Sequence, residues 1–117
     1  MLIDPYRVRV FLATGSTDMR KSINTLGLLV ESSFSLDLFS GNLFAFCGRN
    51  RQLVKILYWD RNGFCLWQKR LEKGRFRWPE QKEDVKEITG RELSWLLEGL
   101  EISSLKPHET LNFSSVS

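Results

Sequence analysis

Positively charged and aromatic side chains gather in one part of the sequence, residues 43–79. Between positions 49 and 77 there are nine lysines and arginines against two acids, a net charge of +7, although the whole chain carries only +3. Three of the four tryptophans also lie in this stretch. DNA and RNA phosphates bind cations spaced along a surface, and unpaired bases stack on aromatic rings. The pattern therefore predicts contact with nucleic acid.

Seven cations of this stretch are candidate nucleic-acid contacts. They are Arg49, Arg51, Lys55, Lys69, Arg70, Arg75 and Arg77. Trp59, Trp67 or Tyr58 could be stacking platforms, but any single aromatic residue on a strand is more often part of the core. The alternative interpretation of the cations is a solvated face with no ligand. The sequence has no zinc finger, recognition helix or ribonucleoprotein motif, so the prediction rests on composition.

Carboxylates that could hold a divalent metal for nucleic-acid cleavage are few. The acids on or beside expected elements are Asp18, Asp60 and Glu72, and each has a simple structural role as a helix cap, a turn residue or a strand end. Cys47 and Cys65 are expected to be buried free thiols, and the single histidine, His108, lies in a polar stretch. We therefore predict no catalytic residues, no metal site and no cofactor.

The pattern of apolar, β-branched and aromatic residues predicts strands at 6–14, 43–47, 53–59, 64–72 and 75–78. Asn62-Gly63 and Lys73-Gly74 are the turn signals between the last three strands. In the last strand, Phe76 and Trp78 alternate with two arginines. One face of the sheet can then be buried while the other stays cationic.

Apolar spacing predicts one helix over residues 18–32, capped by Thr17 or Asp18, and a second helix that begins with a capping box at Thr89 and Glu92. We expect both helices on the same face of the sheet, with much of the basic charge on the opposite face. Residues 80–87 are polar and mostly acidic, and we expect a linker or a solvated turn there.

The order strand, helix, strands, helix predicts an α+β domain over residues 1–102, with a mainly antiparallel sheet of about five strands and two helices. A polar tail, 103–117, would follow. No apolar run approaches the ~18 residues needed to cross a bilayer, and the first residues lack the features of a signal peptide. We expect a cytoplasmic protein that binds neither a membrane nor a small-molecule substrate.

Four runs of the sequence, at 17–30, 39–51, 55–79 and 88–102, resemble a known family. The family is that of the TnpB-like accessory protein of the sixty-six family of bacterial insertion sequences, the product of the second open reading frame. The most specific pieces are the turn at 17–21, the strand at 55–60 and the run at 69–79. The sequence departs from the family's pattern at Asn24-Thr25 and at Asn50, Gln52 and Leu53, where the charge is thinner.

The resemblance implies a role in transposition as an accessory to a separate, larger transposase. Our first hypothesis is that the chain binds DNA at the element's ends and assists the element-encoded transposase. The second is an interaction module that binds the transposase without touching DNA, for which the second helix with Trp95, or the loop with Leu38 and Phe39, would supply the surface. The third, and least favoured, is a metal-dependent nuclease.

Overall fold

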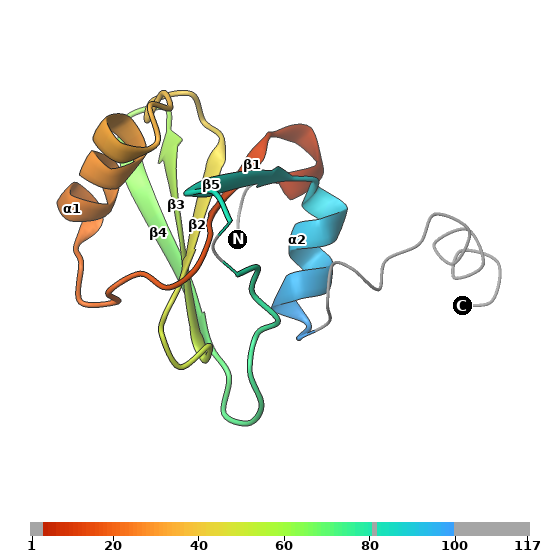
Figure 1. The fold of residues 1–117 in the computed structure, drawn as a ribbon. Coiled ribbons are helices and arrows are strands. Elements are labelled where there is room, and N and C mark those ends of the chain that lie inside the picture. Colours follow the sequence, from red (N-terminus) through yellow and green to blue (C-terminus); the bar gives the residue numbers. More distant parts are fainter. Residues whose placement is uncertain (1–3, 81, 100–117) are drawn as a thin grey trace, which may run out of the picture.

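The computed structural model describes residues 4–80 and 82–99 of the chain. These residues form one five-stranded sheet with helices on both sides (Figure 1). The elements in chain order are η1 (Pro5–Arg7), β1 (Val10–Ala13), α1 (Ile23–Leu28), η2 (Leu29–Ser33), β2 (Leu43–Cys47), β3 (Leu53–Asp60), β4 (Gly63–Arg70), β5 (Val85–Ile88) and α2 (Gly90–Leu97). The predicted α+β class is confirmed. The predicted tail and His108 lie outside the described residues.

The strands lie in the order β4-β3-β2-β1-β5. β2, β3 and β4 follow one another in the chain and pair antiparallel, and β1 pairs antiparallel with β5. β1 and β2 form the one parallel pair. A parallel pair needs a crossover connection, which α1 and the π-helical turn η2 supply. The sheet is therefore mainly antiparallel, as the sequence predicts.

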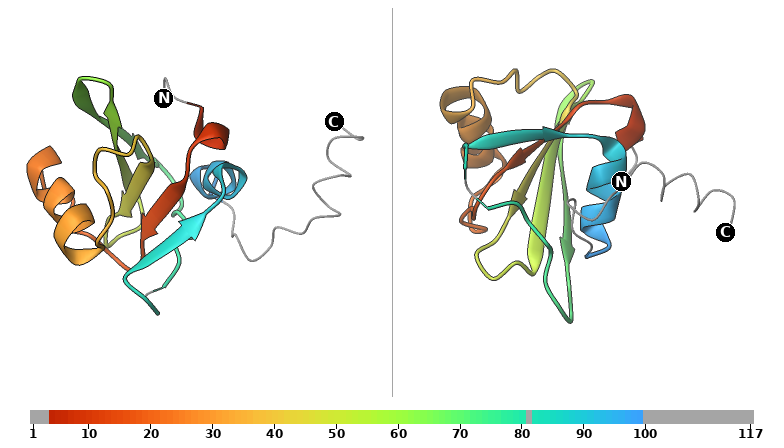
Figure 2. Two further views of the ribbon diagram at one scale, coloured as in Figure 1. Left: turned by 90° about the horizontal axis from the view of Figure 1, so that it is seen from above. Right: turned by 45° about the vertical axis from the view of Figure 1, so that its right-hand side comes forward.

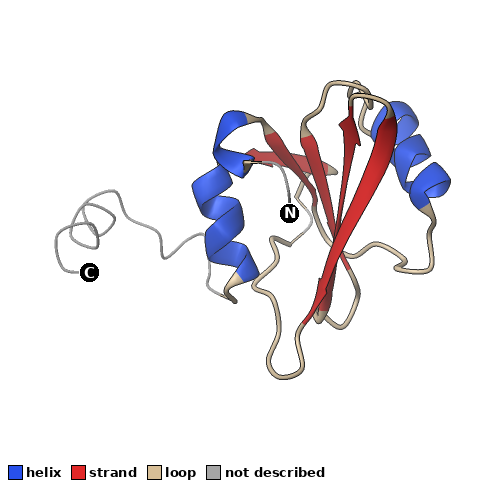
Figure 3. Cartoon of the chain, turned by 180° about the vertical axis from the view of Figure 1, so that it is seen from behind, coloured by secondary structure: helices blue, strands red, loops and turns tan. Residues whose placement is uncertain are grey.

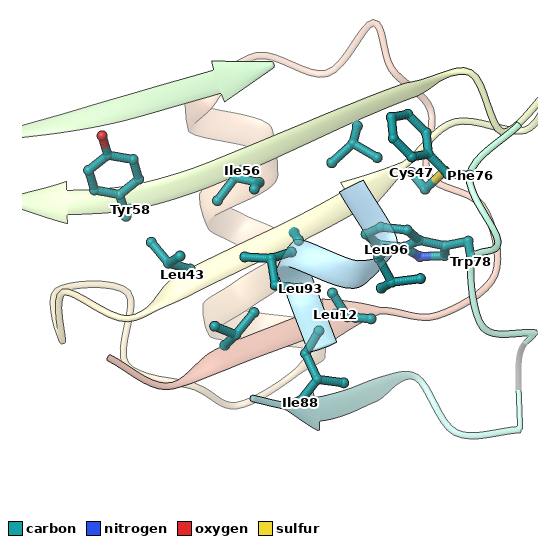
Figure 4. Close-up of a cluster of buried hydrophobic side chains, with 13 residues drawn as sticks. Leu12, Leu43, Cys47, Ile56, Tyr58, Phe76, Trp78, Ile88, Leu93 and Leu96 are labelled. Atoms are coloured by element: carbon teal, nitrogen blue, oxygen red, sulfur yellow. The ribbon is translucent and has the colours of Figure 1, made fainter. Parts of the chain in front are cut away.

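The two helices pack on opposite faces of the sheet, so the expectation that they share one face is wrong (Figures 2 and 3). Leu93 and Leu96 of α2 join one core, which includes Leu12, Leu43 and Ile56 (Figure 4). On the other face, side chains of α1 and η2 pack against three phenylalanines and one leucine of the strands and form a second core. That second core consists of Phe11, Ala13, Leu26, Val30, Leu38, Phe44, Phe46 and Leu57.

The reason for this arrangement is visible in β1 and β2, whose residues are all buried. Neither strand alternates between apolar and polar positions, and continuous apolar runs are typical of strands covered on both faces. An open cationic face over the centre of the sheet is therefore excluded.

Two strand predictions at 6–14 and 75–78 need correction. The chain between Asp4 and Val8 forms the short 3-10 helix η1, with Pro5 at its start and the Asp4 carboxylate accepting the Tyr6 N–H, so β1 begins only at Val10. Residues 75–78 are not a strand. Their alternation is nevertheless as predicted, because Phe76 and Trp78 are buried and the arginines between them are exposed.

The predicted linker at 80–87 is also wrong in part, because residues 85–88 form β5. The first helix starts later than predicted. Ser22 precedes its first turn, and the Ser22 N–H donates to the Thr25 hydroxyl at 3.0 Å. Neither Thr17 nor Asp18 caps it, although both lie in the preceding turn.

The capping box of α2 is confirmed. The Thr89 hydroxyl accepts the Glu92 N–H at 3.1 Å, and the Glu92 carboxylate accepts the Thr89 N–H at 2.8 Å. Gly74 has a φ of +77°, as its predicted turn requires. In the β3–β4 hairpin Asp60 pairs with Gly63, and the residue with positive φ is Arg61 rather than the expected Asn62 or Gly63.

Among the described residues, no helix is long and apolar enough to span a membrane.

Candidate nucleic-acid interface

Five of the seven predicted contact residues, Arg49, Arg51, Arg70, Arg75 and Arg77, lie at one end of the sheet and not on a face. β1, β2 and β4 finish at this end, and β3 and β5 begin there. It therefore carries the loops at 14–22, 48–52 and 71–84, which run along the lower part of Figure 1. With Arg70, the three loops contain nine lysines and arginines and five acids, and eight of these cations but only two of the acids fall in residues 14–22, 48–52 and 70–77. We call these residues the basic end; its cations are Arg20, Lys21, Arg49, Arg51, Arg70, Lys73, Arg75 and Arg77.

A hollow of about 660 Å³ opens in the basic end. We call it the basic hollow. Its lining residues come from the 17–21 turn, the β2–β3 loop and the end of β4; they are Thr17, Met19, Gly48, Arg49, Asn50, Gln52, Leu53 and Arg70. None of them is acidic. Two of the predicted contact residues, Arg49 and Arg70, thus share one site, and both are exposed.

The 17–21 turn forms one wall of the hollow. The Asp18 carboxylate accepts hydrogen bonds from the Arg20 guanidinium, at 2.8 to 3.2 Å, and from the Arg20 backbone N–H. These bonds hold the pKa of the Asp18 carboxyl well below its usual range. The Thr17 N–H donates to the Cys47 carbonyl at 2.9 Å and so fixes the turn to the end of β2.

The β2–β3 loop approaches this turn closely. A side chain at Gly48 would place its Cβ 2.8 Å from the Met19 Cγ, a distance that real Cβ atoms essentially never show. A larger residue at this position would therefore force the Met19 side chain to shift. Cys47, the residue before it, is a buried free thiol as predicted, and burial raises its pKa. Cys65 is a free thiol too but only half-buried.

Arg51 has a different position from the exposed Arg49. Its side chain is only 15% exposed, and its guanidinium donates to the Gly15 carbonyl at 2.6 Å and lies 3.9 Å from the Glu80 carboxylate. The Arg51 carbonyl accepts the Phe76 N–H at 2.7 Å. Arg51 therefore ties together the three loops of the basic end.

Lys55 and Lys69 point to opposite faces of the sheet. Lys55 shares a face with Leu57, whereas Lys69 pairs with Val54 and faces the α2 side. The Lys55 Nζ donates to the Met19 carbonyl at 2.6 Å and thereby supports the wall of the hollow. The Lys69 Nζ donates to the Leu97 carbonyl at 2.9 Å, where a cation complements the carboxyl end of α2.

The proposed stacking platforms are largely occupied by packing. Tyr58 is buried, and Trp67 packs against the core on the α2 side. The Trp59 ring lies 5.0 Å from Phe39 and 4.9 Å from Phe64, measured between ring centres. This cluster lies at the end of the sheet opposite the basic end, and Phe39 is 54% exposed there.

Sequence reasoning missed the apolar and amide residues of the hollow, Met19, Asn50, Gln52 and Leu53 among them. No pattern in the sequence marks these residues as one site. They meet because the parallel pairing of β1 and β2 brings the loops after both strands to one end of the sheet.

The chain matches the family model for the IS66 Orf2 like protein over residues 8–107. It belongs to this family. Two curated relatives come from Sinorhizobium fredii (strain NBRC 101917 / NGR234). Uncharacterized protein y4hO is 43% identical over 101 residues, 86% of this chain and 88% of the relative. Uncharacterized protein y4jC is 33% identical over 106 residues, 90% of this chain and 91% of the relative. No solved structure is significantly similar to the chain.

Membership in the IS66 Orf2-like family confirms the resemblance in the sequence and makes the chain an accessory protein of an insertion sequence. Within residues 4–80 and 82–99, no three histidines, cysteines or acids form a group that could hold a metal ion.

Proposed function

We propose that this IS66 Orf2-like chain binds DNA at the ends of its insertion sequence through the basic end and thereby assists the element-encoded transposase. The observation that carries the proposal is the excess of cations in residues 14–22, 48–52 and 70–77, eight against two acids, which three loops far apart in sequence bring to one end of the sheet. Phosphates supply most of the affinity of proteins for DNA, and they bind such clusters without requiring a sequence motif.

The two acids of the basic end leave its potential positive. Asp18 is paired with Arg20, and Glu72 lies 3.4 Å from Arg70. Both pairs are exposed, where a phosphate can compete with a carboxylate for the same guanidinium. Residues 78–84, the rest of the third loop, add three acids and one lysine beside residues 14 and 15, so acids border the basic end on the side of β5.

The test is DNA binding by purified protein at several salt concentrations, with fluorescently labelled element-end duplex. The Arg49→Gln, Arg70→Gln double variant should weaken binding, and the slope of log affinity against log salt should fall by about two, since each lost phosphate contact removes about 0.9. The Arg75→Gln, Arg77→Gln double variant should behave in the same way. Thermal unfolding should change little, because exposed charges contribute little to stability.

The matched control is the Arg7→Gln, Arg61→Gln double variant. These side chains are 85% and 94% exposed, but they lie at the other end of the sheet. A control that loses as much affinity and slope as the Arg49/Arg70 variant would show that the contact is not local to the basic end. An absence of binding to element ends at low salt, with or without the transposase, would contradict the proposal.

A second candidate function is the interaction module that binds the transposase without DNA. The observation in its favour is the exposed Phe39, which packs on Trp59 and Phe64 away from the basic end. Aromatic side chains are common anchors in protein interfaces. A Phe39→Ala variant that loses the transposase in a pull-down but retains DNA affinity would assign the two functions to opposite ends of the sheet.

A further inference from the structure

We propose that the basic hollow binds an unpaired nucleotide of a DNA strand, with its base against Met19 and Leu53 and its phosphates at Arg49 and Arg70. This inference rests on the proposed DNA binding and adds to it the form of the DNA: a single strand, a frayed end or a flipped nucleotide, in preference to an intact duplex.

The chemistry of the lining fits a base better than a bare phosphate. Met19 and Leu53 supply apolar surface, and Asn50 and Gln52 bring amide groups to the same hollow. A volume of about 660 Å³ lies within the range of about 300–1,000 Å³ that is usual for sites of small organic ligands. A polarisable thioether and a flat guanidinium are both good surfaces for a base ring.

The charge of the lining favours an anionic ligand. Arg49 and Arg70 reach the hollow from different elements, the β2–β3 loop and the end of β4. No lining residue is acidic, and the Glu72 carboxylate, 3.4 Å from Arg70, is exposed and is not part of the lining. Arginine is suited to this position because its guanidinium can bind two oxygens of one phosphate.

Cations on two sides of the basic hollow could bind a DNA strand that continues beyond the bound nucleotide. Arg20 and Lys21 directly follow Met19 on one side. On the other side, the Gln52 amide lies 3.4 Å from the Gly74 carbonyl, and the exposed Arg75 is the next residue. Cations on two sides of the hollow can take the phosphates that precede and follow the bound nucleotide.

A duplex does not use these features. Its bases are stacked and paired, so none reaches an apolar floor unless it is flipped out at a cost of a few kcal/mol. Duplex phosphates would be satisfied by the exposed arginines alone. The apolar residues that line the hollow together with the two arginines therefore favour a strand whose bases are free.

The first experiment compares three labelled DNAs of one sequence: a single strand, a blunt duplex and a duplex with a single-stranded tail. Fluorescence anisotropy at low salt should give tighter binding to the single strand and the tailed duplex than to the blunt duplex. Leu53→Ala should lower the affinity for the single strand about tenfold, as expected when one apolar contact is lost, and should leave blunt-duplex binding unchanged. The matched control is Leu28→Ala, at a leucine that is 60% exposed on α1, which should change neither.

A second measurement needs no disruptive variant. Met19 is one of only two methionines, so protein labelled with ¹³C-methyl methionine gives few signals, and Met19→Leu assigns the one in the hollow. A base stacked on the thioether should shift this signal upfield when the single strand is added, whereas a blunt duplex should leave it in place.

The outcomes separate the two proposals. Equal affinity for the single strand and the blunt duplex, a Leu53→Ala variant that weakens both alike, or a Met19 signal that does not move would overturn the nucleotide site and leave DNA binding by the basic end intact. Binding to none of the DNAs would overturn both.

Discussion

Arg49 and Arg51 show how two like residues of one loop take different roles. Arg49 is exposed at the hollow, whereas the Arg51 guanidinium is held by the Gly15 carbonyl and its backbone has a φ of +62°. A sequence pattern assigns both to the same charge cluster. The difference lies in the backbone conformation of Arg51, which turns its side chain toward the other loops. Arg51 therefore holds these loops together, whereas Arg49 stays exposed to a ligand.

Asp18 should titrate in a way that reports on the 17–21 turn. Its folded-state pKa lies below the unfolded value of about 3.9 because Arg20 binds the carboxylate. The Asp18–Arg20 pair therefore stabilises the folded state at pH values above the unfolded-state pKa. This contribution is lost as the pH falls through the folded-state pKa. In Arg20→Gln the pKa of Asp18 should rise toward its ordinary value. Carboxyl ¹³C NMR measures it directly, and an unchanged pKa would mean that another group holds the turn.

Trp78 should be among the residues most sensitive to substitution. Its side chain is 5% exposed, and its Nε1–H donates to the Ala13 carbonyl at 2.8 Å. Trp78→Ala should lower the free energy of unfolding by about 3–5 kcal/mol in urea titrations, because it leaves a cavity. Trp78→Phe keeps most of the ring but leaves the carbonyl unpaired, and should cost about 1–3 kcal/mol. The comparison is Phe39→Ala at an exposed aromatic; an equal loss there would show that burial is not the cause.

Most of the elements follow from local patterns, and the exceptions have physical reasons. The runs 43–47 and 53–59 became β2 and β3 with at most one residue of difference, and the Thr89 capping box starts α2. β5 was missed because it is a polar edge strand whose middle residues, Lys86 and Glu87, are exposed. Conversely, residues 75–78 have the alternation of a strand but no neighbouring strand to pair with. The alternation of apolar and polar residues indicates which side chains are buried. It does not indicate whether the segment forms hydrogen bonds with a neighbouring strand.

The contact of α2 with η1 reverses the usual effect of a helix glycine. A Cβ at Gly90 would overlap the Pro5 carbonyl, a backbone group that cannot swing away. Gly90→Ala should therefore destabilise the protein by roughly 1–3 kcal/mol in thermal or urea unfolding, although alanine normally favours a helix by about 1 kcal/mol.

Gly27→Ala in α1 is the matched control. The added methyl group there meets only the Leu38 side chain, at 3.0 Å from its Cδ2, and that side chain can shift. Gly27→Ala should be neutral or mildly stabilising. If both variants change the stability by the same amount, helix propensity and not the Pro5 contact determines the effect of Gly90→Ala.

The three acids that the sequence offers as metal ligands do not converge in the structure. Asp60 lies at the β3–β4 hairpin, whereas Asp18 and Glu72 lie at the basic end, so the three cannot bind one metal ion. Purified protein with Mg²⁺ or Mn²⁺ should leave supercoiled, linear and single-stranded DNA intact on gels. Specific nicking that disappears in Asp18→Ala or Asp60→Ala would contradict this expectation.

The sequence predicted which residues belong to the candidate site but not where in the fold they lie. The cations were named correctly as a cluster, and the family resemblance marked the 17–21 turn and the run at 69–79. Their convergence could not be derived, because it depends on the parallel pairing of β1 with β2, a contact between distant segments. Arg49 and Arg70 meet at one hollow because β3 pairs antiparallel with both β2 and β4, which places the β2–β3 loop beside the end of β4. Lys55 and Lys69, on adjacent strands, face apart.

The position of β1 in the sheet also sets the order in which a newly made chain can fold. β1 is synthesised first among the strands, yet one of its two neighbours, β5, is synthesised last. While the ribosome produces the chain, β2, β3 and β4 can pair as they emerge, but one edge of β1 stays open until residues 85–88 appear. An open edge on a strand buried on both faces is a template for pairing with other chains. A product that stops short of β5 is therefore expected to aggregate rather than to persist as a smaller domain.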